Sequence, residues 1–142
     1  MELFRFMSKE EFNKLIKGEV LYNDTIHIGK TNSVGFCFLS LKEYKPEEAI
    51  HFLSGIVNME VCVKIRTKDK FKKSYGIYAK PLNKTQNVDV ELFFDFLLGL
   101  SKIEKMKVTE YTCKKYSLEN IEILSYAKPI WGKSNWDWKS IN

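Results

Sequence analysis

A two-residue alternation of apolar side chains in residues 57–66, VNMEVCVKIR, constrains the fold of this chain more than any other feature. Side chains alternate between the two faces of an extended strand, so every second position of this segment belongs to one buried face. The inward positions are Val57, Met59, Val61, Val63 and Ile65. The pattern predicts a β-strand, and YGIYA (75–79) is the expected hairpin partner across a lysine-rich loop.

Two helices are predicted from their end signals. Ser8 is a favoured N-cap residue, and Glu11 three positions later completes the pattern of a capping box. Gly18 is a natural C-terminal cap for this first helix. Pro46 suits the first position of a second helix, which we expect to end near Leu53.

The rest of the chain predicts several strands and one further helix. Residues 34–40, VGFCFLS, have apolar or small residues on both faces and predict a buried strand. The segment 88–100 suits either helix or strand, but its polar positions recur every four residues, so we expect a helix continuing to about Glu104. The other expected strands are 2–7, 106–115 and 121–126.

These elements predict an α+β fold with two to three helices. Regular βαβ alternation is absent, which argues against a doubly wound parallel sheet. The 142 residues suit a single domain over 1–142, with a core at about 2–126 and a tryptophan-bearing C-terminal tail at 127–142.

Composition excludes some classes of protein. No apolar run is long enough to span a bilayer, and the N-terminal residues lack the pattern of a signal peptide, so we expect a cytoplasmic protein that does not enter membranes. The three cysteines are widely spaced, and the chain has only two histidines, which argues against a disulfide framework and a metal site. The net charge of +5 permits an acidic partner without requiring one.

Two charged residues lie on otherwise apolar strand faces. Arg5 shares a face with Leu3 and Met7, and Glu110 shares a face with Met106 and Val108. Because a buried charge is costly without a partner, each needs a counter-charge or a hydrogen-bond donor. They could pair with each other or with a nearby lysine, or both could face a cleft in which a ligand supplies the missing partners.

Three segments that contain these residues resemble ADP-ribosyltransferase-like domains. LFRFMSKEEFNKLIKGEVL resembles the family's opening strand with an arginine, its amphipathic helix and the following glycine. TNSVGFCFLS is similar to its middle motif, a small hydroxyl residue that leads into an aromatic-rich strand. VTEYTCKKYSLENIEIL resembles its last motif, a strand glutamate followed by a turn and a closing strand. The three occur in the family's order between about residues 2 and 126.

The resemblance implies a split, mostly antiparallel sheet with a cleft for NAD. Arg5 matches the arginine that steadies the phosphates and ribose of the dinucleotide. Ser33, or alternatively Thr31, matches the hydroxyl that shapes the cleft. Glu110 matches the catalytic glutamate, which favours the oxocarbenium-like sugar as nicotinamide departs.

The resemblance also implies an aromatic contact, and the chain departs from the family pattern in two places. Phe36 or Phe38 is expected to stack on the nicotinamide ring. The first departure is in the middle motif, TNSVGFCFLS, which lacks the family's full run of three hydroxyl residues. Members that modify arginine usually carry a second acid two positions before the catalytic glutamate, where this chain has Val108. An arginine acceptor is therefore not expected.

Two hypotheses of function follow. In the first, the chain is a small enzyme that moves ADP-ribose from NAD to a protein or nucleic-acid acceptor. In the second, it is a non-catalytic binding or inhibitory module, acting through protein contacts or through a basic loop at 66–73 that binds nucleic acid. Phe71 and Tyr75 are interleaved with the lysines of this loop, as in surfaces that bind a phosphate backbone.

Overall fold

The computed structural model describes residues 1–23, 35–53, 58–79 and 105–141. The predicted helix at 88–104 and the candidate residues Ser33 and Thr31 lie outside these ranges. In chain order the elements are β1 (Glu2–Met7), α1 (Lys9–Ile16), β2 (Leu21–Tyr22), β3 (Phe36–Ser40), α2 (Pro46–Leu53), β4 (Val61–Thr67), β5 (Lys72–Ala79), β6 (Lys105–Cys113), β7 (Lys115–Tyr116) and β8 (Ile121–Ala127).

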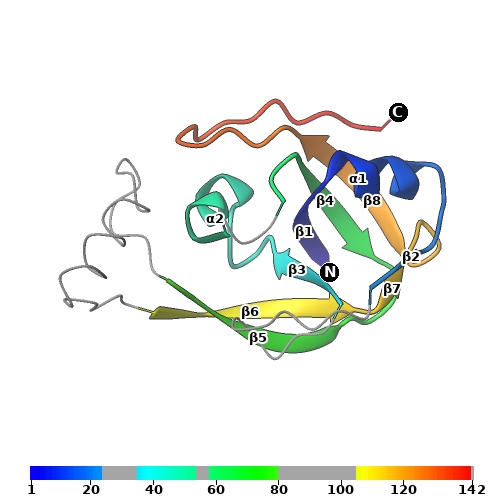
Figure 1. The fold of residues 1–142 in the computed structure, drawn as a ribbon, viewed down its shortest axis with the longest axis horizontal. Coiled ribbons are helices and arrows are strands. Elements are labelled where there is room, and N and C mark those ends of the chain that lie inside the picture. The colour runs from blue at the N-terminus through cyan, green and yellow to red at the C-terminus, as the bar shows by residue number, and fades with distance from the viewer. Residues whose placement is uncertain (24–34, 54–57, 80–104, 142) are drawn as a thin grey trace.

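Six of the strands form one sheet in the order β5-β6-β3-β1-β4-β8, and β2 pairs with β7 in a small second sheet (Figure 1). Each pairing between described strands is antiparallel. The prediction of an α+β fold with a mostly antiparallel sheet is therefore confirmed.

The large sheet is weakly joined at its centre. Only Leu3 and Phe4 of β1 pair with β3, opposite Ser40 and Leu39, whereas all of β1 from Glu2 to Met7 pairs with β4. The sheet therefore consists of two halves, β5-β6-β3 and β1-β4-β8, which separate toward the C-terminal end of β1. In Figure 1 the β5–β6 pair runs below the strands of the other half.

Helix α1 begins and ends as its sequence predicts. The Ser8 side chain accepts a hydrogen bond from the backbone N–H of Glu11 at 3.0 Å. At the other end, Gly18 has φ +83°, its N–H bonds to Leu15 O, and the N–H of Glu19 bonds to the carbonyl of the residue before Leu15. This is a Schellman motif, in which a glycine readily adopts the left-handed conformation. No helix among the described residues is long and apolar enough to cross a membrane.

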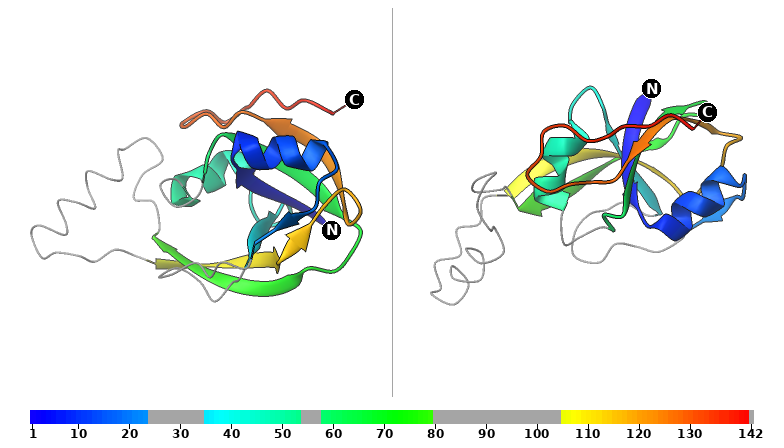
Figure 2. Two further views of the ribbon diagram at one scale, coloured as in Figure 1. Left: turned by 45° about the vertical axis from the view of Figure 1, so that its right-hand side comes forward. Right: turned by 90° about the horizontal axis from the view of Figure 1, so that it is seen from above.

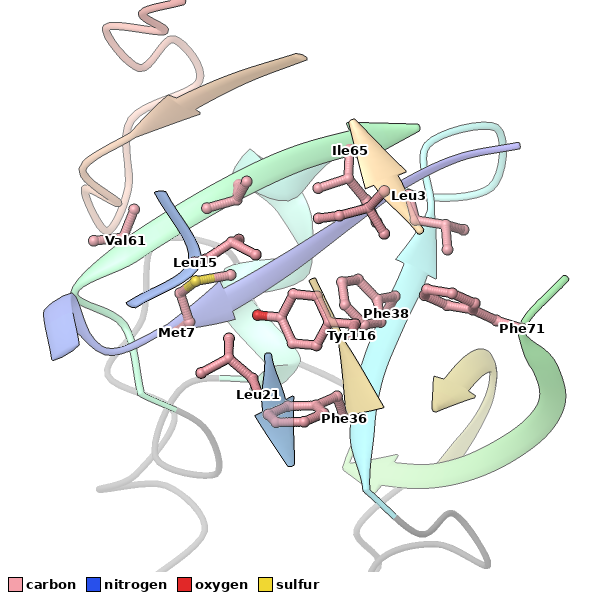
Figure 3. Close-up of a cluster of buried hydrophobic side chains, with 12 residues drawn as sticks. Leu3, Met7, Leu15, Leu21, Phe36, Phe38, Val61, Ile65, Phe71 and Tyr116 are labelled. Carbon is pink, nitrogen blue, oxygen red and sulfur yellow. The ribbon is translucent and has the colours of Figure 1, made fainter. Parts of the chain in front are cut away.

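Buried apolar side chains form two clusters, one on each face of the sheet. Figure 3 shows the first cluster, in which Tyr116 lies close to Phe36 and Phe38. Its buried members are Leu3, Met7, Leu15, Leu21, Phe36, Phe38, Val61, Val63, Ile65, Phe71, Tyr116 and Ile121. The second cluster includes Phe4, Phe6, Leu39, Ala49, Ile50, Phe52, Leu53, Cys62, Tyr78, Val108, Ala127 and Trp136.

Strand β4 lies between β1 and β8 and is covered on both faces. The predicted hairpin pairing of this strand with 75–79 is wrong, because β5 pairs with β6. Val61, Val63 and Ile65 join the first cluster, as predicted, whereas Met59 precedes the strand and packs against the second cluster. Cys62, on the opposite face, is also fully buried in the second cluster. The alternation therefore identified the strand but not the burial of its other face, which α2 and the C-terminal tail provide.

The C-terminal tail packs against the domain beyond β8. Tyr126 and Lys139 exchange two backbone hydrogen bonds of 2.9 and 2.8 Å. Trp136 is buried and Trp138 stacks against it, while Trp138 Nε1 donates to Glu47 of α2 at 3.0 Å. Figure 2 shows the tail passing beside α2.

Candidate functional site

Arg5 lies where the two halves of the sheet separate. Its Nε and Nη2 atoms donate to the two carboxylate oxygens of Glu11 at 2.7 and 2.9 Å, and Nη1 donates to the carbonyl of Cys37 at 3.2 Å. The contact with Glu11 is bidentate, the strongest geometry for an arginine–carboxylate pair. Because Cys37 belongs to β3, the guanidinium bridges the two halves of the sheet and the first turn of α1.

A third residue, Tyr116, completes this buried charged cluster. Its hydroxyl donates to Glu11 Oε2 at 2.6 Å. Burial opposes ionisation of Glu11, but the hydrogen bond and positive charge of Arg5 outweigh it and lower the pKa of Glu11 below its ordinary value. Burial also opposes the charge of Arg5, yet Glu11 raises the pKa of that guanidinium above its usual range. Both charged forms are therefore stabilised within the chain.

The two candidate aromatic residues lie beside Arg5 in the core. The Arg5 Cζ atom lies 5.0 Å from the Phe36 ring centroid and 5.8 Å from that of Phe38. Phe36 also contacts Tyr116 edge-on, with ring centroids 4.8 Å apart. Both phenylalanines are buried, so they support the guanidinium and the core and do not present an open face to a ligand.

Glu110 lies on the opposite face of the sheet from Arg5. In β3, Phe38 shares its face with Arg5 and stands opposite Tyr111 of β6. Glu110 is the neighbour of Tyr111 in β6, and side chains of successive strand residues point to opposite faces. Glu110 therefore points into the second cluster, where it is fully buried.

The partner of Glu110 is a tyrosine of the neighbouring strand. The hydroxyl of Tyr78 in β5 donates to Glu110 Oε1. Burial and the hydrogen bond to Glu110 raise the pKa of Tyr78 far above its ordinary value. Glu110 Oε2 has no hydrogen-bond partner among the described residues.

The structure therefore brings Arg5, Phe36 and Phe38 together but separates them from Glu110. A pairing of Arg5 with Glu110, or of either with a lysine, is not what the structure shows. The actual partners are Glu11, Tyr116 and Tyr78, which sequence reasoning missed. The sequence contained a signal for Glu11, because the first turn of a helix directly after β1 can bring a carboxylate back onto that strand. The sequence predicts Glu11 as part of a capping box, but its side chain bonds to Arg5 and Tyr116.

A second candidate is a basic depression in the surface at the loop between β4 and β5. It has a volume of about 880 Å³ and is lined by Met1, Thr67, Lys68, Asp69, Lys70, Phe71, Lys72, Lys73 and Tyr111. Lys68 Nζ donates to the carbonyl of Leu118 at 3.1 Å. Among the ion pairs of the described residues, none includes Lys70, Lys72 or Lys73.

One face of the β5–β6 pair continues from this depression. Register places Lys73 opposite Tyr111, Tyr75 opposite Thr109, and Ile77 opposite Lys107, so their side chains share a face. We call this the lysine–tyrosine face; its members are Lys73, Tyr75, Ile77, Lys105, Lys107, Thr109 and Tyr111. Tyr75 lies close to the basic loop in the sequence, whereas the β6 members come beside that loop only through strand pairing, which the sequence does not display.

Tyr75 is the most accessible aromatic residue of this face, with 45% of its surface exposed. The Lys107 Nζ atom lies 4.0 Å from the centroid of its ring. No described carboxylate pairs with Lys73, Lys105 or Lys107. The arrangement offers an external anion an aromatic ring and ammonium groups that pair with no described carboxylate.

The described residues contain no group of three or more histidine, cysteine, aspartate or glutamate side chains that could hold a metal ion. Comparison of the chain with models of known protein families, with curated protein sequences and with solved structures finds no match.

Proposed function

We propose that this protein is a binding module for nucleic acid, which it contacts through the basic depression. The observation that carries the proposal is that Lys70, Lys72 and Lys73 line one depression without forming an ion pair with any described residue. Among the described residues of the lining, Asp69 is the one carboxylate. Ammonium groups that pair with no described carboxylate are suited to replacing counterions along a phosphate backbone.

The rest of the charge distribution agrees with this proposal. The chain carries a net charge of +5 at pH 7, which favours long-range attraction of an anionic polymer. The lysines lie around Phe71 and Tyr111, so apolar surface is present at the base of the depression. Phosphate contacts from lysine give affinity without reading sequence, so binding should depend little on base order.

A salt titration with a triple variant tests the proposal. Binding of a labelled oligonucleotide to the wild type should weaken steeply with salt. Lys70→Gln/Lys72→Gln/Lys73→Gln should bind roughly tenfold more weakly, with a slope of log affinity against log salt that is shallower by about 2. Fluorescence anisotropy at several salt concentrations measures both quantities.

A charge-matched variant serves as the control. Lys9→Gln/Lys128→Gln/Lys133→Gln removes the same charge from exposed positions elsewhere. Lys128 follows the end of β8 that lies beside Cys62, whereas the loop at 67–70 lies beside the start of β8 at Ile121. Equal losses in the two variants, or binding that does not respond to salt, would contradict a local site.

A second candidate is the ADP-ribosyltransferase-like enzyme. The observation that favours it is that the three strands carrying the resembling motifs, β1, β3 and β6, are neighbours, and that the sheet opens between β1 and β3. Catalysis through Arg5 and Glu110 would require Arg5 to leave Glu11, and one ligand to reach both faces of the sheet. Nicotinamide release from NAD, abolished by Glu110→Gln, would support the enzyme over the binding module.

A further inference from the structure

We propose that the lysine–tyrosine face is a base-stacking surface, so that the nucleic acid bound by this protein is single-stranded. The inference rests on the proposed function and adds the structural class of the ligand. It is carried by the exposed ring of Tyr75 and by the lysines that flank it on both strands.

The composition of the face suits one kind of occupant. Lys73, Lys105 and Lys107 supply positive charge, and none of the described residues on this face of β5 and β6 is acidic. Tyr75 is 45% exposed on the strand adjoining the basic depression. Lysines that neutralise phosphate beside aromatic rings that accept bases are the two components of surfaces that bind single strands.

The exposure of the Tyr75 ring favours a single strand over a duplex. Tyr75 is 45% exposed, whereas Tyr111, its diagonal neighbour on the same face, packs against the first hydrophobic cluster. Tyr75 is therefore the ring of this face that can accept a base by its π-face. A single strand can present the face of an unstacked base to this ring, whereas each base inside a duplex is stacked between its neighbours.

Lys107 places a phosphate-binding charge beside the ring on which a base would stack. Its Nζ atom lies 4.0 Å from the Tyr75 ring centroid and covers one side of the ring. An incoming base can stack on the exposed part of the ring, while the ammonium contacts the adjoining phosphate. The ring and the charge therefore act on one nucleotide, and the base is held by its π-face and not by its hydrogen-bonding edge.

The test compares a labelled oligothymidylate, a labelled oligouridylate and a duplex of equal length. Both single strands should bind about tenfold more tightly than the duplex at the same salt concentration, because the stacking contact is absent from the duplex. Tyr75→Thr, which keeps a strand-favouring residue but removes the ring, should lose about tenfold in single-strand affinity. Tyr75→Phe should bind as the wild type does.

An exposed tyrosine outside the face controls for lost aromatic surface. Tyr22 of β2 is 72% exposed, and Tyr22→Thr should leave single-strand binding nearly unchanged. If the duplex binds as tightly as the single strands and Tyr75→Thr has no effect, the stacking inference is overturned while salt-dependent binding through Lys70, Lys72 and Lys73 stands. If polyglutamate binds and no nucleic acid does, both proposals are overturned.

Discussion

The charges of the cluster around Arg5 are buried and paired, whereas those of the lysine–tyrosine face are exposed and pair with no described carboxylate. Arg5 has two hydrogen bonds to Glu11 and one to Cys37, and the side chains of Arg5 and Glu11 are each only 16% exposed. On the lysine–tyrosine face, Lys73 and Lys107 are exposed, and no described carboxylate pairs with them.

This difference separates structural charges from those available to a ligand. A buried charge needs a partner for the chain to fold at all, so Arg5 obtains one from its own helix. An exposed lysine incurs no comparable penalty and can remain unpaired. The position of Arg5 on an apolar strand face made it a candidate binding residue in the sequence. In the structure, exposure and the lack of a described counter-charge make the lysines the better candidates.

The largest expected effect comes from breaking the buried pair. Arg5→Met should lower the free energy of unfolding by about 3–5 kcal/mol, because it leaves the carboxylate of Glu11 largely buried without its counter-charge. Urea denaturation measures the change. Arg5→Met/Glu11→Leu should recover much of the loss, with Tyr116 still lacking its acceptor. A single-variant loss below about 1 kcal/mol would remove the structural role assigned to Arg5.

A smaller loss is expected from the pair on the other face. Tyr78→Phe removes the donor to Glu110 Oε1 and should cost about 1–3 kcal/mol, since the carboxyl group stays buried with neither oxygen hydrogen-bonded to a described residue. Tyr75→Phe, on the same strand with an exposed ring, is the matched control and should leave stability unchanged. Equal urea midpoints for both variants would argue that the Tyr78 hydrogen bond contributes nothing.

The pH dependence of stability tests whether Glu11 is ionised as the partner of Arg5. Its pKa is lower in the folded protein than the ordinary value of 4.5, so the folded state favours its ionised form. The stabilisation is fully present above about pH 4.5 and is lost as the pH falls through the folded pKa. Glu11→Gln should therefore show a flatter acid limb in urea midpoints measured against pH. An unchanged acid limb would show that other carboxyl groups dominate.

The smallest expected effect is on the stability of lysine variants. Lys70→Gln/Lys73→Gln should change the free energy of unfolding by no more than about 0.5 kcal/mol, because both side chains are exposed and form no ion pair with a described residue. Thermal and urea unfolding of the double variant measure this quantity. A destabilisation comparable to that of Arg5→Met would show that these lysines, like Arg5, are structural charges.

Much of the local structure could be predicted from the sequence. Ser8, Gly18 and Pro46 mark helix ends through their own backbone and side-chain chemistry. Helix α1 begins and ends, and α2 begins, where these residues indicate. The strands at 2–7, 121–127 and in most of 61–67 follow the alternation of apolar residues. Such signals depend on contacts within a few residues, which the sequence displays directly.

The candidate site was less predictable, because strand register determines which face of the sheet each charged side chain occupies. Alternation shows that Arg5 and Glu110 each share a strand face with apolar residues, but it cannot show whether the two strand faces lie on the same side of the sheet. The pairing of Phe38 with Tyr111 decides this and places Glu110 on the other side. A shift of that register by one residue would have reversed the result.

The sequence by itself determined the α+β class, both ends of α1, the start of α2, and the presence of charges that needed partners. Only the tertiary structure decided which partners they found. Tyr116 reaches Glu11 across 105 residues of sequence, and Tyr78 reaches Glu110 across 32. Contacts at such separation depend on strand order and register, which arise from the packing of the whole sheet and not from the residues adjoining each charge.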